Sequence, residues 1–167
     1  ILLEHVSVEK AGELDPATAS RANIQAGAQL GDLITWSDVS ANDGAGDGLL
    51  LTDTDVSSPV VVGGSYSNNT GMGIHSRNAA LNLQGVDIVG NGGPGIGSLT
   101  EGGAVEGFIQ GCTITDNSGA GIELFFMGGD VQFNTIAFNG DYGVRYAPRG
   151  VAPVTFANNL LQGNVKP

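Results

Sequence analysis

A short phrase with constant internal spacing recurs through the middle of this chain and limits the folds that the chain can form. The phrase is N-x-x-x-G-[IV], and its four clear copies begin at Asn69, Asn91, Asn117 and Asn139. The apolar residue that closes each copy recurs after 22, 26 and 22 residues. Repeats of this length indicate a solenoid, in which each repeat is one supersecondary unit that buries its apolar face against its neighbours.

A second apolar column precedes the Asn column by three positions. The two columns together predict seven full or partial copies, whose upstream apolar residues are Val8, Val39, Tyr66, Ile88, Ile114, Ile136 and Leu161. The Asn position is filled by Ala11, Asn42, Asn69, Asn91, Asn117, Asn139 and Asn164. In the second copy, the loop 43–48 is two residues longer than its later equivalents. We therefore expect one repeat domain over residues 1–167, a segment of a longer protein because neither end shows a capping helix.

The units of this repeat are expected to be strands. The segments are too short and too rich in glycine for helices of ~11 residues, whereas β-branched residues in alternation are typical of strands. Asn and Gly tolerate the left-handed backbone of a sharp corner, and an inward Asn can bond the backbone of its own turn. Stacking would place equivalent residues about 4.8 Å apart. Ile74, Ile96, Ile122 and Val144 should then form one continuous interior column.

The stretch Ile114-Thr115-Asp116-Asn117-Ser118-Gly119-Ala120-Gly121-Ile122 resembles the repeat of right-handed parallel β-helix proteins in the pectate-lyase-like superfamily. The resemblance covers about residues 30–164 and is weaker over 1–29. It implies an all-β fold, a right-handed parallel β-helix of about seven turns. A leucine-rich repeat is the rival, because Val86-Asp87-Ile88-Val89-Gly90-Asn91 fits LxLxxN. That fold needs helical return segments, where this chain has Gly-Ile strands.

The composition of the chain argues against several classes of binding partner. The chain has 17 Asp and Glu against 6 Lys and Arg, a net charge of −11, which argues against nucleic acid and anionic membrane surfaces. No run approaches the ~18 apolar residues of a membrane span. The one cysteine, Cys112, cannot form an internal disulfide and has no His or Cys neighbour for zinc. We expect it in a packed interior corner, in a column with Val6, Ser37, Gly64, Val86, Asn134 and Asn159.

The face of the Gly-Ile strands is where chemistry could lie. Because side chains alternate along a strand, the outward residues form two columns: Leu50, His75, Gly97, Glu123 and Arg145, and then Thr52, Arg77, Leu99, Phe125 and Ala147. The resemblance implies that this sheet lines a carbohydrate groove. His75 as base, Glu123 as acid, and Arg77 and Arg145 on a sugar carboxylate would suit a lyase, epimerase or hydrolase.

The alternative is that these polar residues are ordinary surface. Glu123 and Arg145 would be a cross-strand ion pair about 5 Å apart, with His75 about 10 Å from Glu123. The Asp-Pro-His-Glu motif of alginate epimerases is replaced by Gly73-Ile74-His75-Ser76-Arg77-Asn78. The polygalacturonase motifs are also absent, since Asn134-Thr135-Ile136 keeps only Asn-Thr.

One loop is a candidate calcium site. Asp43, Asp47 and Asp53 cluster there with Asp38 and Asp55, and residues 44–49 loosely resemble the calcium-binding GGxGxD repeat. Carboxylate oxygens and flexible glycines suit Ca²⁺. The alternative is a set of acidic residues in a solvated turn, because that motif works as stacked repeats and this chain has one imperfect copy.

These patterns favour a non-catalytic β-helix module of a secreted or cell-surface protein, a scaffold or adhesive face for polysaccharide or another protein. The alternative is a fragment of a polysaccharide lyase, epimerase or hydrolase. Trp36 and Phe126 are either sugar-stacking platforms or space-filling residues. An ice-binding face would need a regular Thr ladder, which Asp87 and Leu160 interrupt beside Thr113 and Thr135. Uncapped ends predict end-to-end self-association.

Overall fold

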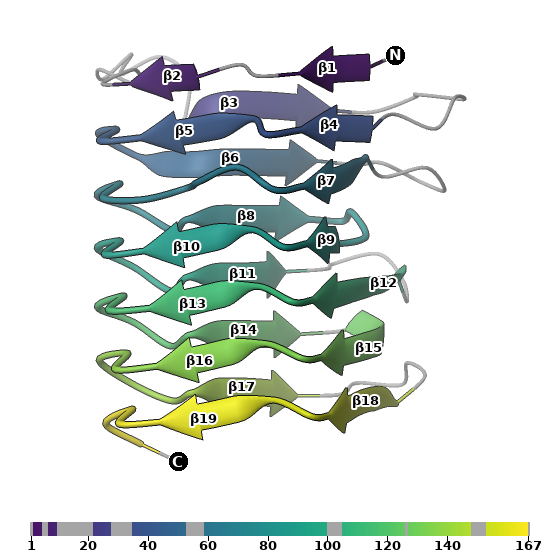
Figure 1. Ribbon diagram of the computed structural model, residues 1–167, viewed down its shortest axis with the longest axis vertical. Coiled ribbons are helices and arrows are strands. Elements are labelled where there is room, and N and C mark those ends of the chain that lie inside the picture. Colours follow the sequence, from purple (N-terminus) through teal and green to yellow (C-terminus); the bar gives the residue numbers. More distant parts are fainter. Residues whose placement is uncertain are drawn as a thin grey trace.

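Successive turns of this chain stack into a parallel β-solenoid, shown by a computed structural model (Figure 1). The structure describes residues 2–4, 7–9, 22–27, 35–52, 59–99, 105–125, 127–147 and 153–166. The turns follow one another along the long axis, so the two chain ends lie at opposite ends of the molecule. Among the described residues there is no helix long and apolar enough to cross a membrane.

The solenoid has three parallel sheets. The first has the order β1 (Leu2–Glu4), β4 (Thr35–Ser37), β7 (Val60–Val62), β9 (Asn82–Gln84), β12 (Val105–Gln110), β15 (Met127–Gln132) and β18 (Val154–Ala157). The second has the order β17 (Val144–Ala147), β14 (Ile122–Phe125), β11 (Ile96–Leu99), β8 (Ile74–Arg77), β6 (Asp47–Thr52) and β3 (Ala22–Gly27). The third contains β10 (Asp87–Val89), β13 (Thr113–Thr115), β16 (Thr135–Ala137) and β19 (Leu160–Gln162).

The third sheet is extended by a separate pair, β2 (Ser7–Glu9) with β5 (Ser40–Asn42). Backbone hydrogen bonds link this pair to the rest, because the amide of Ala41 donates to Ser65 and the amide of Tyr66 donates to Asp87. Between β5 and β10 the third sheet is interrupted, and only an isolated bridge joins Ser65 to Asp87.

The solenoid has about five turns, and the expectation of seven is wrong. A full turn needs one strand in each sheet, which holds for β1–β3, β4–β6, β9–β11, β12–β14 and β15–β17. The turn with β7 and β8 has only the isolated bridge on its third side, and the last turn has only β18 and β19. Counting motif copies overestimated the number because partial copies carry the motif without completing the turn.

The predicted interior column is confirmed. Ile96 pairs in register with Ile74 and with Ile122, and Ile122 pairs with Val144. The three isoleucines are fully buried, and Val144 packs against the same core from the last of these strands. Burial of apolar side chains on every turn is the main stabilising contribution in such a stack.

The predicted Asn ladder is also confirmed, and it consists of Asn69, Asn91, Asn117, Asn139 and Asn164. In each step the side-chain oxygen of one Asn accepts from the backbone amide and the side-chain amide of the Asn one turn earlier, at 2.8–3.1 Å. The remaining side-chain N–H of each donates to a corner carbonyl, such as Tyr66 or Ile88. Buried amides thus satisfy buried backbone groups turn after turn.

The second copy departs from the expected alignment. Val8 pairs with Ala41 rather than with Val39, and the backbone amide of Gly44 donates to Asn69 as ladder residues do. Residues 44–49 therefore form a copy of normal length with Gly44 in the Asn position, and the predicted longer loop is wrong. Asn23 fills the missing place: its side chain lies against Gly44 and donates to Asn69 Oδ1 at 3.1 Å.

A second ladder lies at the other corner. Cys112 N donates to Asn134 Oδ1 at 2.9 Å, and Asn134 N and Nδ2 donate to Asn159 Oδ1 at 3.0 and 2.9 Å. Cys112 is buried as expected, and that burial raises the pKa of its thiol to about 11. Trp36 is buried, which favours its space-filling role, whereas Phe126 lies outside the described residues.

Candidate functional site

The two outward columns of the second sheet have the predicted register. Gly97 pairs with both His75 and Glu123, and Glu123 pairs with Arg145. Arg77 pairs with Leu99 in the second outward column. Leu50 pairs with His75 as expected but is buried.

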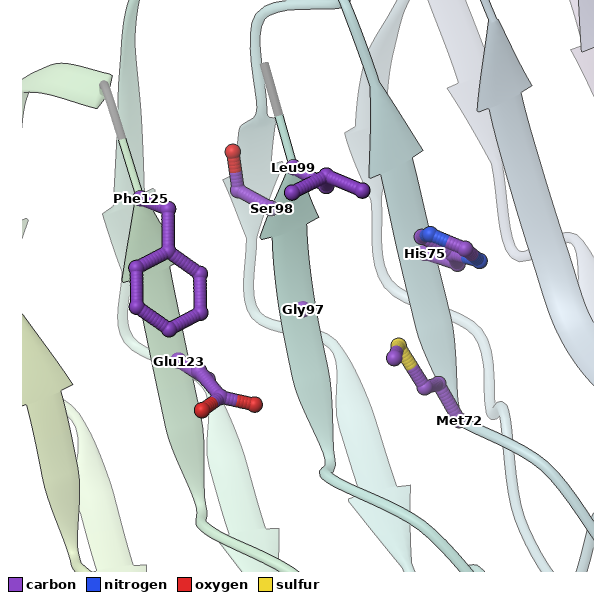
Figure 2. A pocket seen from close by; sticks show the side chains of 7 residues that line it. All are labelled: Met72, His75, Gly97, Ser98, Leu99, Glu123 and Phe125. Atoms are coloured by element: carbon purple, nitrogen blue, oxygen red, sulfur yellow. The ribbon is translucent and has the colours of Figure 1, made fainter. Parts of the chain in front are cut away.

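A pocket of about 270 Å³ opens on this face, over strands β8, β11 and β14. Figure 2 shows its lining: Met72, His75, Gly97, Ser98, Leu99, Glu123 and Phe125. The lining is mainly apolar, with His75 on one side and Glu123 on the other. His75 and Glu123 are the two predicted site residues that the structure brings into this pocket. Arg77 and Arg145 belong to the same sheet but do not line it.

Gly97 creates the space for the pocket. It interrupts the first outward column between His75 and Glu123, so no side chain of β11 fills the interval between them. The thioether of Met72 reaches over the glycine, and a Cβ on residue 97 would lie 2.5 Å from Met72 Sδ. Figure 2 shows Met72, just before β8, and Glu123, on β14, approaching Gly97 from its two sides. Met72 was not predicted as a site residue, although the glycine in the outward column was a signal that could have located the pocket.

His75 is oriented by a carboxylate from the preceding turn. Its Nδ1 lies 2.8 Å from Asp47 Oδ2, and the other oxygen of Asp47 accepts from the backbone amide of Met72 at 2.8 Å. Asp47 therefore fixes both the imidazole and the backbone that carries the Met72 wall. With Nδ1 in this bond, any proton transfer by His75 would have to use Nε2.

Glu123 and Arg145 form the other polar edge of the site. Arg145 Nη1 donates to Glu123 Oε1 at 2.7 Å, and the guanidinium lies 5.4 Å from the centre of the Phe125 ring. The Glu123 side chain is 18% exposed and that of Arg145 is 52% exposed. An ion pair with one partner this exposed stabilises the fold little. Its effect is to hold Glu123 beside the pocket and to place a cation on the aromatic ring.

The structure separates the candidate calcium ligands. Asp47 is directed at His75 and Met72, whereas Asp43 is exposed at a corner with φ of 56°. Asp53 lies outside the described residues. No group of three His, Cys, Asp or Glu side chains with metal-binding geometry occurs in the described part of the chain. The calcium site remains a prediction.

Comparisons with protein-family models, with curated proteins and with solved structures gave no match for this chain.

Proposed function

We propose that this chain is a non-catalytic β-solenoid module that binds a glycan on the outer face of β8, β11, β14 and β17, within a secreted or cell-surface protein. The pocket over Gly97 is the observation that carries the proposal. A sugar ring has an apolar face of C–H groups and an edge of hydroxyls. Leu99 and Phe125 offer apolar surface to the first, and His75 and Glu123 offer hydrogen bonds to the second. Ligand sites commonly combine a mainly apolar lining with a few placed polar groups.

The polar pairs support binding rather than catalysis. A general acid must carry the proton that it donates, but Glu123 is paired with the Arg145 guanidinium at 2.7 Å. Arg145 in turn has its cation on Glu123 and on the Phe125 ring, so it is not held ready for a sugar carboxylate. These contacts preorganise a binding surface, which lowers the entropy lost on association.

A glycan-binding assay with matched variants tests this function. Phe125→Ala removes the aromatic wall of the pocket, and Thr52→Ala is the control because Thr52 shares the outward column but lies outside the pocket. Loss of the aromatic contact should weaken glycan binding by about tenfold, which corresponds to about 1.4 kcal/mol. The control should bind like the parent chain. Equal binding by Phe125→Ala, or no binding to any glycan of a broad array, would refute the proposal.

A second candidate function is a polysaccharide lyase, epimerase or hydrolase, and the Asp47–His75 pair favours it. A carboxylate bonded to one ring nitrogen orients the imidazole and suits a general base. Incubation with uronic-acid polymers should distinguish the two functions. Unsaturated or shortened products that disappear in His75→Ala would establish the enzyme and overturn the binding module.

We also propose that the solenoid is right-handed and belongs to the pectate-lyase-like superfamily. Three parallel sheets and a stacked Asn ladder support this assignment. An experimental structure in which the chain coils in the left-handed sense would contradict it.

A further inference from the structure

Two phenylalanines lie at the ends of strand β16, at corners where bulky residues are rare. Phe133 has φ of 58° and Phe138 has φ of 57°. Where the structure describes the equivalent positions on other turns, they hold Gly, Asn or Asp, namely Asp38, Gly63, Gly85, Gly111 and Asn158 at the first corner and Asp43, Asn68, Gly90, Asp116 and Gly163 at the second. The turn that contains β16 therefore has a bulky residue at both corners where those turns have Gly, Asn or Asp.

Folding does not explain the two phenylalanines. In the left-handed region Cβ crowds the following carbonyl, and a bulky residue there is a genuine outlier. Burial could offset this strain, but Phe133 is 61% exposed and Phe138 is 57% exposed. Strained residues that the fold does not need are found preferentially at functional sites.

The ring of Phe138 packs on the next turn of the solenoid, at Gly163. A Cβ on Gly163 would lie 2.5 Å from Phe138 Cδ1, so the ring lies against the glycine below it. A side chain at residue 163 would displace the ring from this position. The absence of a side chain at Gly163 thus lets the ring of Phe138 pack on the next turn while the residue stays mostly exposed.

The face of β16 between the two corners has no charged side chain. Its outward rows are Thr113, Thr135 and Leu160, and then Thr115, Ala137 and Gln162. The charged side chains nearest to it on this sheet are acidic, because Asp87 of β10 pairs with Thr113 and Asp116 follows β13. In a protein with a net charge of −11, this face suits a neutral ligand and repels an acidic one.

We propose that Phe133, Phe138 and the face of β16 between them form a second glycan surface, which binds a neutral β-linked polysaccharide. Such a chain presents flat C–H faces that stack on the two rings and hydroxyl edges that bond Thr135 and Gln162. The two corners are five residues apart, at most about 16 Å of extended chain, so one polysaccharide can reach both rings. The surface lies on a different sheet from the Gly97 pocket, and it shares with the proposed function only the class of ligand.

The double variant Phe133→Asn with Phe138→Asn tests the proposal through two readouts. Asn tolerates the left-handed backbone and fills equivalent corners elsewhere in the chain. Binding to insoluble cellulose in a pull-down assay should fall at least tenfold. The melting temperature should hold or rise by about 2–4 °C as strain is relieved. A fall in melting temperature with unchanged cellulose binding would show that the rings serve the fold and would overturn the inference.

Two control variants separate this surface from the pocket. Phe133→Tyr with Phe138→Tyr keeps both rings and should retain binding. Thr52→Ala lies outside the pocket and on another sheet, and should leave cellulose binding unchanged. If glycan binding is lost in Phe125→Ala but kept in the double Asn variant, the proposed function stands and the second surface does not.

Two further outcomes would overturn the second surface. One is binding to polygalacturonate in preference to cellulose, because the face beside Asp116 should reject an acidic polymer. The other is loss of self-association in the double Asn variant, measured by light scattering, with no cellulose binding by the parent chain. That result would assign the rings to contacts between copies of the chain.

Discussion

Replacing Asn117 by Ala should remove one link from the middle of the Asn ladder. Asn117 Oδ1 accepts from Asn91 N at 3.1 Å and from Asn91 Nδ2 at 2.8 Å. Its Nδ2 donates to Ile88 O at 3.1 Å and to Asn139 Oδ1 at 3.0 Å. The side chain is 1% exposed, so water cannot take over these bonds without opening the turn. Four hydrogen bonds are lost at once.

The magnitude follows from that count. A buried hydrogen bond contributes about 1 kcal/mol net, so the variant should lose about 4 kcal/mol of its free energy of unfolding. Whole domains are stable by about 5–15 kcal/mol, which makes this a large fraction of the total. The Asn91 amide and the Ile88 carbonyl each lose a partner, and unsatisfied buried groups increase the loss further.

Urea unfolding followed by circular dichroism measures the loss, with Asn164→Ala as the matched variant at the end of the ladder. Asn164 makes three such bonds and is only partly buried, so water can replace them and the loss should be about 1–2 kcal/mol. A reduced denaturant slope would reveal local unfolding of single turns, which solenoids permit. Either of two results would refute the ladder as a source of stability. One is a stability of Asn117→Ala within about 1 kcal/mol of the parent, and the other is an equal loss in the two variants.

Three other predictions can be tested on the same chain. Gly64→Ala, at φ of 83°, should lower the free energy of unfolding by about 3 kcal/mol or more, because its Cβ would collide with the backbone carbonyl of Val39. Gly85→Ala, with open space at φ of 62°, should lower it by only about 1 kcal/mol. Equal losses in thermal or urea unfolding would contradict this difference in packing. Cys112 keeps its proton in the folded state up to about pH 11, whereas an unfolded thiol loses it near about 8.5. Stability should therefore fall by about 3 kcal/mol as pH rises across that interval, and a Cys112→Ala variant with the same pH dependence would exclude this cause. Added Ca²⁺ should leave the melting temperature unchanged, because both oxygens of Asp47 are already hydrogen-bonded; a rise that disappears in Asp47→Asn would instead establish the calcium site.

The regular turns could be predicted because the residues that define each turn lie close together in the sequence. Asn91, Gly95 and Ile96 repeat the spacing of Asn69, Gly73 and Ile74, and equal spacing forces equivalent residues into register when turns stack. The same alternation places His75 and Glu123 on one sheet face. Where the corners keep a constant length, counting residues is enough to predict which residues pair between turns.

The pocket and the second copy could not be obtained in this way. Gly44 breaks the Asn column, and the side chain that replaces the missing Asn comes from Asn23 in strand β3, outside the repeated phrase. The hydrogen bond between Asp47 and His75 likewise joins residues 28 positions apart. Neither pairing leaves a periodic trace in the sequence.

The sequence by itself determined the repeat, its all-β character, the interior column and the outward residues of the second sheet. Only the tertiary structure decided how many turns are complete, which side chain fills a vacant ladder position and where the surface is hollow. The physical reason is that periodicity specifies the backbone path and the face of each residue. Contacts such as Met72 over Gly97 depend instead on how far individual side chains reach between stacked turns.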